Sequence, residues 1–140
     1  MKKVKRGDLI ITTTSEDLEG VCRCVAWLGE AQIVTGGHTA IFKHNQNPKF
    51  IAYWFASADF TGQKRKIAYG TKVTEVKPKN LSDFLIPLPP LLIQEKIASI
   101  LDQLQALSSD LEQGIPAEIR ARKKQFNYYL NHLLDFKGQA

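Results

Sequence analysis

Cysteine and histidine side chains are the residues of this sequence best suited to hold a metal or to act as nucleophiles. Cys22 and Cys24 are two positions apart, and His38 is the nearest histidine. A zinc site built from these three ligands would lack a fourth. Cysteines at this spacing in a strand point to the same face, without the usual geometry of a structural disulfide. We therefore expect free thiols in a reducing cytoplasm, with neither a metal nor a cofactor.

Motifs of the common enzyme families are missing from the sequence. It contains no Walker loop, no Gly-x-Gly-x-x-Gly fingerprint, no His-Glu-x-x-His motif and no Gly-x-Ser-x-Gly nucleophile elbow. No run approaches the roughly 18 apolar residues of a membrane span, so none is expected. The sequence therefore predicts a chain that binds a partner rather than one that transforms a substrate. An enzyme with an unfamiliar site is an alternative.

A run of three basic residues, Lys64-Arg65-Lys66, follows a predicted helix. Such a cluster can contact the phosphates of a polyanion. It can equally compensate the negative end of the helix dipole, and the sequence leaves both interpretations open. The net charge of +5 over 140 residues is compatible with a polyanionic partner but does not require one.

Small polar or basic residues near the ends of predicted strands are further candidates. Loops at strand ends can present hydrogen-bond donors to the base edges or phosphates of a nucleic acid, and ordinary turns explain the same residues equally well. The aromatic residues Phe50, Trp54 and Phe55, at helical spacing, are expected in the core rather than as a base-stacking surface. The candidates at strand ends are Thr13, Thr14, His38, Thr71 and Lys72.

The elements that would position these residues form a β-rich part before Pro87. Short runs rich in β-branched residues alternate with turns, and a helical pattern starts at Pro48 and ends by Gly70. The predicted fold class is α+β: a small twisted β-sheet or partial barrel with one packed helix, followed by a long coiled-coil-type helix. The predicted strands are residues 9–14, 21–27, 32–35, 39–43, 72–76 and 84–88, and the first helix covers residues 48–67.

A helical pattern with coiled-coil spacing follows Pro90. Apolar residues recur at intervals of three and four, like the a and d positions of a heptad, with an extra step of four near Gly114. Pro116 interrupts this pattern, which therefore indicates either one long kinked helix or a helical hairpin; the continuous seam favours the long helix. The predicted helix-pairing residues are Ile93, Ile97, Ile100, Leu104, Leu107, Leu111, Ile115, Ile119, Phe126, Tyr129 and Leu133.

Charge is distributed unevenly along the chain. Residues 1–85 contain 13 Lys and Arg against 8 Asp and Glu, whereas residues 86–140 contain 6 of each. Within the helical part, residues 92–115 have a net charge of −3 and residues 116–140 a net charge of +3. Antiparallel pairing with a second copy, or with a similar helix, sets opposite charges against each other. We therefore expect a homodimer, or pairing with another such chain.

Two stretches of the sequence carry a family resemblance: residues 70–102, with Pro87-Leu88-Pro89-Pro90-Leu91 and Gln94-Glu95-Lys96-Ile97, and residues 114–129, with Arg122-Lys123-Lys124-Gln125-Phe126. The first resembles the junction in specificity (S) subunits of type I restriction-modification enzymes, where a last strand passes through a Pro-x-Pro-Pro-Leu segment into a long helix. The second is similar to a stretch of that long helix in one subgroup of the family. Weaker matches lie upstream, in Arg6-Gly7-Asp8-Leu9-Ile10 and Gly36-Gly37-His38-Thr39-Ala40-Ile41.

The resemblance implies a DNA target recognition domain at residues 1–88, a helix for antiparallel pairing at residues 89–136 and a tail at residues 137–140. It implies a cytoplasmic, non-catalytic chain that gives DNA sequence specificity to a methyltransferase. The implied partners are double-stranded DNA, a methyltransferase (M) subunit and a second S chain, with no membrane. The alternative is an interaction module that pairs with M or S subunits without binding DNA.

Three departures from the family pattern accompany the resemblance. The sequence has one domain-plus-helix unit where an S subunit usually has two, and its recognition domain is expected to lack the part that usually precedes the Gly-Asp-Leu-Ile strand. Ile93 stands where the family commonly has an acidic residue. Helix pairing is therefore better supported by the sequence than complete DNA recognition.

Overall fold

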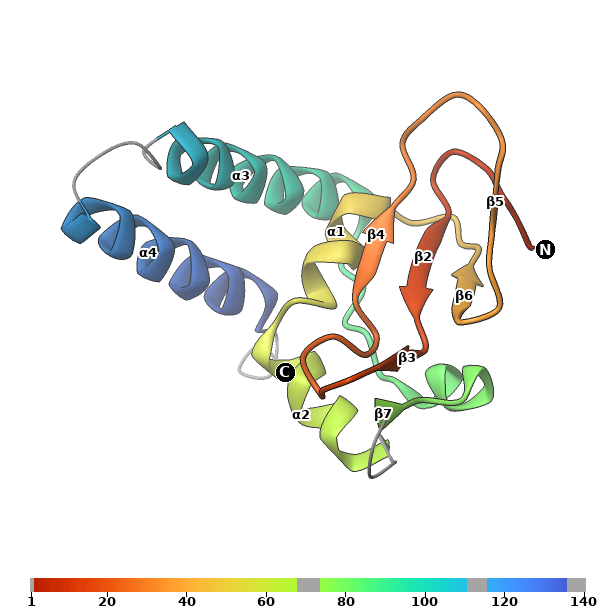
Figure 1. The fold of residues 1–140 in the computed structure, drawn as a ribbon. Coiled ribbons are helices and arrows are strands. Elements are labelled where there is room, and N and C mark those ends of the chain that lie inside the picture. Colours follow the sequence, from red (N-terminus) through yellow and green to blue (C-terminus); the bar gives the residue numbers. More distant parts are fainter. Residues whose placement is uncertain (1, 68–73, 111–115, 136–140) are drawn as a thin grey trace. The chain divides into compact units, whose positions relative to one another are not determined.

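The computed structural model describes residues 2–67, 74–110 and 116–135 (Figure 1). The chain divides into two compact units, Met1–Ile86 and Pro87–Ala140. The first unit contains small antiparallel sheets and short helices, and the second contains two longer helices. The predicted α+β class is therefore confirmed.

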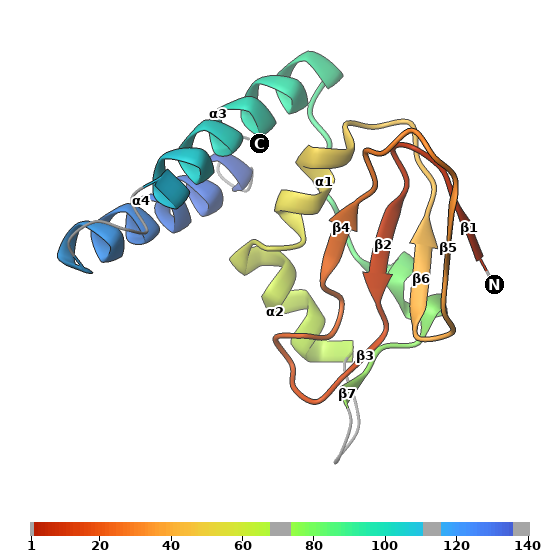
Figure 2. The same ribbon diagram turned by 45° about the horizontal axis from the view of Figure 1, so that its top comes forward.

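A three-stranded antiparallel sheet is the centre of the first unit. Its order is β4–β2–β6, with β2 at Leu9–Thr12, β4 at Cys24–Ala26 and β6 at Thr39–Phe42. Figure 2 shows β2 between its two neighbours, with the helices of this unit beside β4. Leu9 and Ile11 alternate along β2, so both point to the same face, where both are fully buried.

Two smaller strand pairs complete the β-structure. β1 (Lys2–Val4) pairs with β5 (Ile33–Thr35), and β3 (Thr14–Ser15) pairs with β7 (Thr74–Glu75), both antiparallel. The predicted strand 9–14 is thus split into β2 and β3. The split lies at Thr13, whose N–H donates to the carbonyl of His38 and whose carbonyl accepts from the N–H of Val76.

The predicted helix 48–67 is two helices, α1 (Pro48–Trp54) and α2 (Ala58–Ile67). α1 begins with an Asn47 side chain that accepts from the Phe50 N–H at 2.9 Å, a typical N-cap. Between the helices, the Ser57 hydroxyl donates to the Trp54 carbonyl at 2.6 Å and accepts from the Phe60 N–H at 3.4 Å. These bonds replace the helical pattern for one turn and redirect the chain.

Aromatic side chains from both helices fill the core of this unit. Phe50, Trp54 and Phe60 are fully buried, whereas Phe55 is half-buried. The rings of Phe60 and Phe84 lie 4.7 Å apart between centroids, so the end of the unit is packed onto α2. The expectation of a core role is confirmed for Phe50 and Trp54.

No strand forms over residues 84–88, contrary to the prediction. A 3₁₀ helix, η1 (Pro78–Asp83), precedes this segment. The Leu85 N–H donates to the Gln63 side chain at 3.0 Å, and the Leu85 carbonyl accepts from the same amide at 3.1 Å. A side chain of α2 thus supplies the partner that a neighbouring strand would otherwise provide.

The second unit consists of α3 (Leu91–Asp110) and α4 (Pro116–Leu134), which contact each other. α3 begins directly after Pro90, whose carbonyl accepts from the N–H groups of Ile93 and Gln94. α4 begins at Pro116, which suits a first turn because no hydrogen bond is needed from its nitrogen there. The structure thus has the helical hairpin, the alternative left open by the sequence, in place of one continuous helix.

Within the described ranges, none of the helices combines the length and the apolar character that crossing a bilayer requires.

Candidate nucleic-acid interface

Lys64 and its two basic neighbours have different environments. The Lys64 side chain is only 6% exposed, and its Nζ donates to the Val21 carbonyl at 3.1 Å. The ammonium also lies 5.6 Å from the centre of the Phe60 ring. Burial lowers the pKa of Lys64, and the nearby Cys22, Glu19 and Asp17 partly offset this effect. Arg65 and Lys66 are exposed and are free to face a polyanion.

Residues 16–23, here called the 16–23 loop, connect β3 to β4. This loop contains Val21, whose carbonyl accepts the hydrogen bond from the Lys64 ammonium. Asp17 accepts from the Gly20 N–H at 2.7 Å, and a Cβ at Gly20 would lie within 2.1 Å of the Ser15 hydroxyl oxygen. Cys22 has φ +60, which costs a non-glycine residue about 1–2 kcal/mol. Its N–H donates to the Thr12 carbonyl at 2.6 Å, which holds this strained residue against β2.

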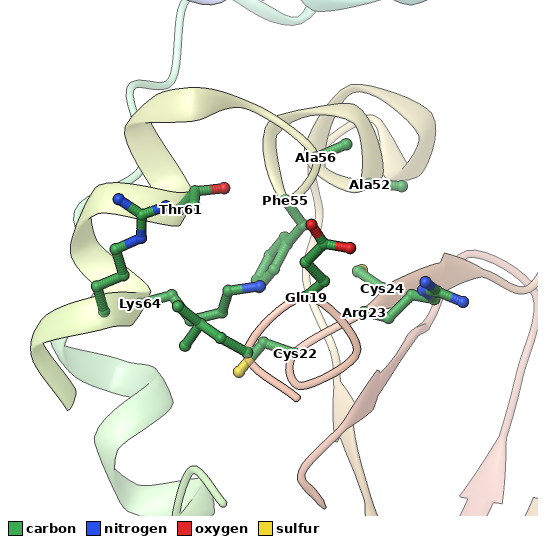
Figure 3. A pocket seen from close by; sticks show the side chains of 11 residues that line it. Glu19, Cys22, Arg23, Cys24, Ala52, Phe55, Ala56, Thr61 and Lys64 are labelled. Carbon is green, nitrogen blue, oxygen red and sulfur yellow. The ribbon is translucent and has the colours of Figure 1, made fainter. Parts of the chain in front are cut away.

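A cavity of about 320 Å³ lies between the 16–23 loop and the helices α1 and α2. Figure 3 shows Lys64 reaching from α2 towards the loop that carries Glu19 and Cys22. The lining brings together four charged side chains from segments far apart in sequence, three of them positive. These are Glu19, Arg23, Lys64 and Arg65.

The two cysteines at this cavity are free. Burial raises the pKa of the Cys22 thiol to about 11 and that of Cys24 to about 12. Both thiols are therefore protonated at neutral pH and are poor nucleophiles. Within the described residues, no three His, Cys, Asp or Glu side chains are grouped as metal ligands would be.

The predicted site residues that the structure describes in the first unit gather at one end of the central sheet, where β2 ends and β6 begins. Thr13 and His38 are joined there by a backbone hydrogen bond of 3.0 Å; Thr13 is buried and His38 is exposed. Thr14, half-buried, is in β3, directly beyond this end. In Figure 1 the C-terminal end of α2, which carries Arg65 and Lys66, lies near β7 at the same end. Thr71 and Lys72 lie outside the described residues.

The predicted helix-pairing residues divide into two groups on α3. Ile97 is buried and Leu104 half-buried, whereas Ile93, Ile100 and Leu107 are 39%, 44% and 51% exposed. The three exposed residues are spaced by seven, so they form one stripe along the helix, here called the α3 stripe. The hairpin therefore leaves three of the five described seam residues on α3 exposed.

On α4, the predicted residues Ile119, Phe126 and Leu133 are half-buried and Tyr129 is 36% exposed. Leu111 and Ile115 lie outside the described residues. Sequence reasoning missed the buried positions next to the predicted seam, because a heptad pattern does not specify which side of a helix a hairpin covers. These missed residues are Ala98, Leu101, Leu130 and Leu134.

Arg23 is a candidate functional residue that the sequence did not indicate. It is a single arginine in a β-rich stretch, with no neighbouring basic residue to form a cluster. Only the fold brings it to the same cavity as Lys64 and Arg65. The nearest sequence signal was the turn at Gly20, which marks a loop but not what that loop approaches.

Comparisons with known proteins agree with the resemblance. The family model of the Type I restriction modification DNA specificity domain matches residues 2–121. The chain is 39% identical over 92 residues to the putative type I specificity subunit S.MpnORF285P of Mycoplasma pneumoniae, covering 66% of this chain and 30% of that protein.

Two further relatives match a shorter stretch. The chain is 47% identical over 62 residues to the type I restriction enzyme MpnII specificity subunit of Mycoplasma pneumoniae, covering 44% of this chain and 19% of that protein. It is 37% identical over 67 residues to the EcoR124I/EcoR124II specificity subunit of Escherichia coli, covering 48% and 17%. The chain thus spans less than a third of the length of these three relatives. With the family model matching most of its residues, the chain belongs to the family of type I restriction-modification DNA specificity domains.

Proposed function

We propose that this chain recognises DNA sequence as a specificity subunit, or half-subunit, of a type I restriction-modification methyltransferase complex. The first unit would bind double-stranded DNA, and the second would pair helices and engage a methyltransferase subunit. In this proposal the chain itself carries no catalytic residue, and methyl transfer belongs to its partner. The observation that carries the proposal is the gathering of the candidate DNA-binding residues at one end of the central sheet.

Three properties of that end support DNA binding. The exposed side chains of His38, Arg65 and Lys66 offer donors and positive charge. The whole positive excess of the chain lies in residues 1–85, with 13 Lys and Arg against 8 Asp and Glu. Loops at one end of a rigid sheet are also a common place for binding residues. We include Thr13, Thr14 and Lys64 in this region, with Thr13 and Lys64 contributing to its shape because both are buried. Thr71 and Lys72, outside the described residues, stay proposed as DNA-binding residues from the sequence.

DNA binding, with and without a methyltransferase subunit, tests this proposal. We expect fluorescence anisotropy with a labelled duplex to show affinity that falls steeply with salt, because Lys and Arg displace counterions from phosphates. Replacing Arg65 and Lys66 together by alanine should weaken binding across DNA sequences. Unchanged affinity in this double variant would remove the basic cluster from the interface.

A second candidate is an interaction module that pairs with M or S subunits without binding DNA. The exposed α3 stripe favours it, because that stripe belongs to the second unit and needs no DNA-binding part. Capture of a methyltransferase subunit by a chain that binds no duplex at any salt concentration would support this candidate over the first.

A further inference from the structure

We propose that Arg23 and Arg65 bind backbone phosphates of DNA at the cavity beneath the 16–23 loop, and that Lys64 is the positioning residue that holds this loop. The inference rests on the proposed DNA-binding function and specifies which cations carry it. It gives the residues of the basic cluster different roles: Lys64 bonds to the 16–23 loop of the protein, whereas Arg65 binds a DNA phosphate.

Arg23 and Arg65 come from different elements but line the same cavity. Both side chains are exposed, and neither guanidinium has a hydrogen-bond or ion-pair partner within residues 2–67, 74–110 and 116–135. With Lys64 they outnumber the single carboxylate of Glu19 at this cavity. Guanidinium groups suit phosphate because their planar donors match its oxygens in pairs.

Lys64 is not placed to share this task. Its ammonium already donates to the Val21 carbonyl at 3.1 Å, and the side chain is 6% exposed. Reaching a phosphate would break that bond and leave a buried carbonyl unpaired, which costs about 1–3 kcal/mol. The ammonium also lies 5.6 Å from the centre of the Phe60 ring, and the attraction between a cation and an aromatic face holds it from the α2 side.

The bond from Lys64 reaches the loop at its strained point. Val21 precedes Cys22, the residue with φ +60, and Arg23 follows. The Arg23 carbonyl accepts from the Thr12 N–H at 3.0 Å, so its backbone is tied to the central sheet. Because the loop backbone is held from both sides, binding DNA orders the Arg23 side chain but not its backbone, which lowers the entropic cost of binding.

The arginine part of the inference is tested with Arg23→Gln and Arg65→Gln in the full chain, using a mixed-sequence DNA duplex. Each variant should reduce the slope of log affinity against log salt concentration by about 0.9, the value expected for one phosphate contact. Lys79→Gln is the matched control, because it removes one exposed positive charge of the same unit away from the cavity. Its slope should stay at the wild-type value.

Failure has two distinguishable forms. If the wild-type chain binds the duplex and both arginine variants keep its salt slope, the phosphate site is wrong while the DNA-binding function stands. If the wild-type chain binds no duplex, the proposed function fails and the phosphate site fails with it.

Lys64→Met tests the positioning role, because methionine keeps an apolar stem but removes the ammonium. We expect lower DNA affinity with an unchanged salt slope, together with faster hydrogen exchange at the Cys22 amide, which bonds to Thr12. A slope reduced by about 0.9 would make Lys64 itself a phosphate contact and overturn its assignment. Unchanged exchange at Cys22 would also overturn it, and this readout does not depend on DNA binding.

Discussion

At the scale of single residues, the 16–23 loop depends on groups that tolerate little change. Gly20 leaves room for the Ser15 side chain, and Asp17 bonds to the Gly20 N–H. Cys22 accepts an uncommon backbone conformation because Thr12 and Lys64 hold its surroundings. Strain of this kind persists only where neighbouring contacts over-determine the backbone. The loop is therefore shaped before any partner arrives.

Gly20→Ala should destabilise the chain by about 1–2 kcal/mol, because the new Cβ would lie 2.1 Å from the Ser15 Oγ and 3.1 Å from the Asp17 carboxylate. The measurement is urea unfolding followed by circular dichroism. Gly36→Ala is the control, since a Cβ there meets nothing within 4 Å. Equal stability of the two variants would contradict the close packing at Gly20.

At the scale of elements, the breaks within the predicted strand 9–14 and the predicted helix 48–67 come from hydrogen bonds that periodicity does not show. The strand and helix residues around Thr13 and Ser57 keep the alternating or helical pattern of their neighbours. The chain nevertheless breaks at both. At Thr13 the backbone groups bond to the distant residues His38 and Val76, and at Ser57 the hydroxyl bonds to the nearby Trp54 carbonyl. The sequence pattern predicted β2, β4, β6 and a helical region after Pro90, since alternation and heptad spacing are local; it favoured one long helix there, where the structure has α3 and α4.

Residue periodicity also did not predict how the elements are connected and packed, because it describes each element separately. Residues near Pro116 permit a kink or a hairpin, and the apolar pattern continues beyond them after one extra step of four, which fits both arrangements. Likewise, Arg23 reaches its cavity through the pairing of β4 with β2, a contact between residues distant in the chain. Neither outcome is encoded by the spacing of residues along one element.

Ser57→Ala should cost about 1 kcal/mol of unfolding free energy, because the hydroxyl caps the start of α2 and is 2% exposed. Thermal or urea unfolding would measure the loss. Ser99→Ala is the matched control, as Ser99 is exposed within α3 and alanine favours helices. A Ser57 variant as stable as wild type would show that the break between α1 and α2 does not depend on this cap.

At the scale of the whole molecule, the second unit presents an apolar surface that the hairpin does not use. The α3 stripe, Ile93, Ile100 and Leu107, has the heptad spacing that a second helix requires. Because residues 92–115 have a net charge of −3 and residues 116–140 a net charge of +3, opposite charges meet when the α3 stripe of one copy pairs with α4 of a second copy. The proposed homodimer would use this stripe.

We expect size-exclusion chromatography with light scattering to give a homodimer, and Leu107→Lys to shift it towards monomer, because the variant places a charge in the α3 stripe. Ala106→Lys adds the same charge at the neighbouring exposed position outside the stripe, and should leave the dimer intact. A wild-type monomer throughout the micromolar range would rule out self-pairing.

The Gln63 amide has a consequence for how this sequence can diverge. It pairs with both main-chain groups of residue 85 and with none of its side-chain atoms, and the Leu85 side chain is 78% exposed. Position 85 is therefore open to almost any substitution during evolution, with proline excluded because it lacks the N–H. Position 63 has no such freedom, because only a side chain with both a donor and an acceptor can make these two bonds. We therefore expect Gln63 to be retained in related sequences, since it fixes the backbone just before the first unit ends at Ile86.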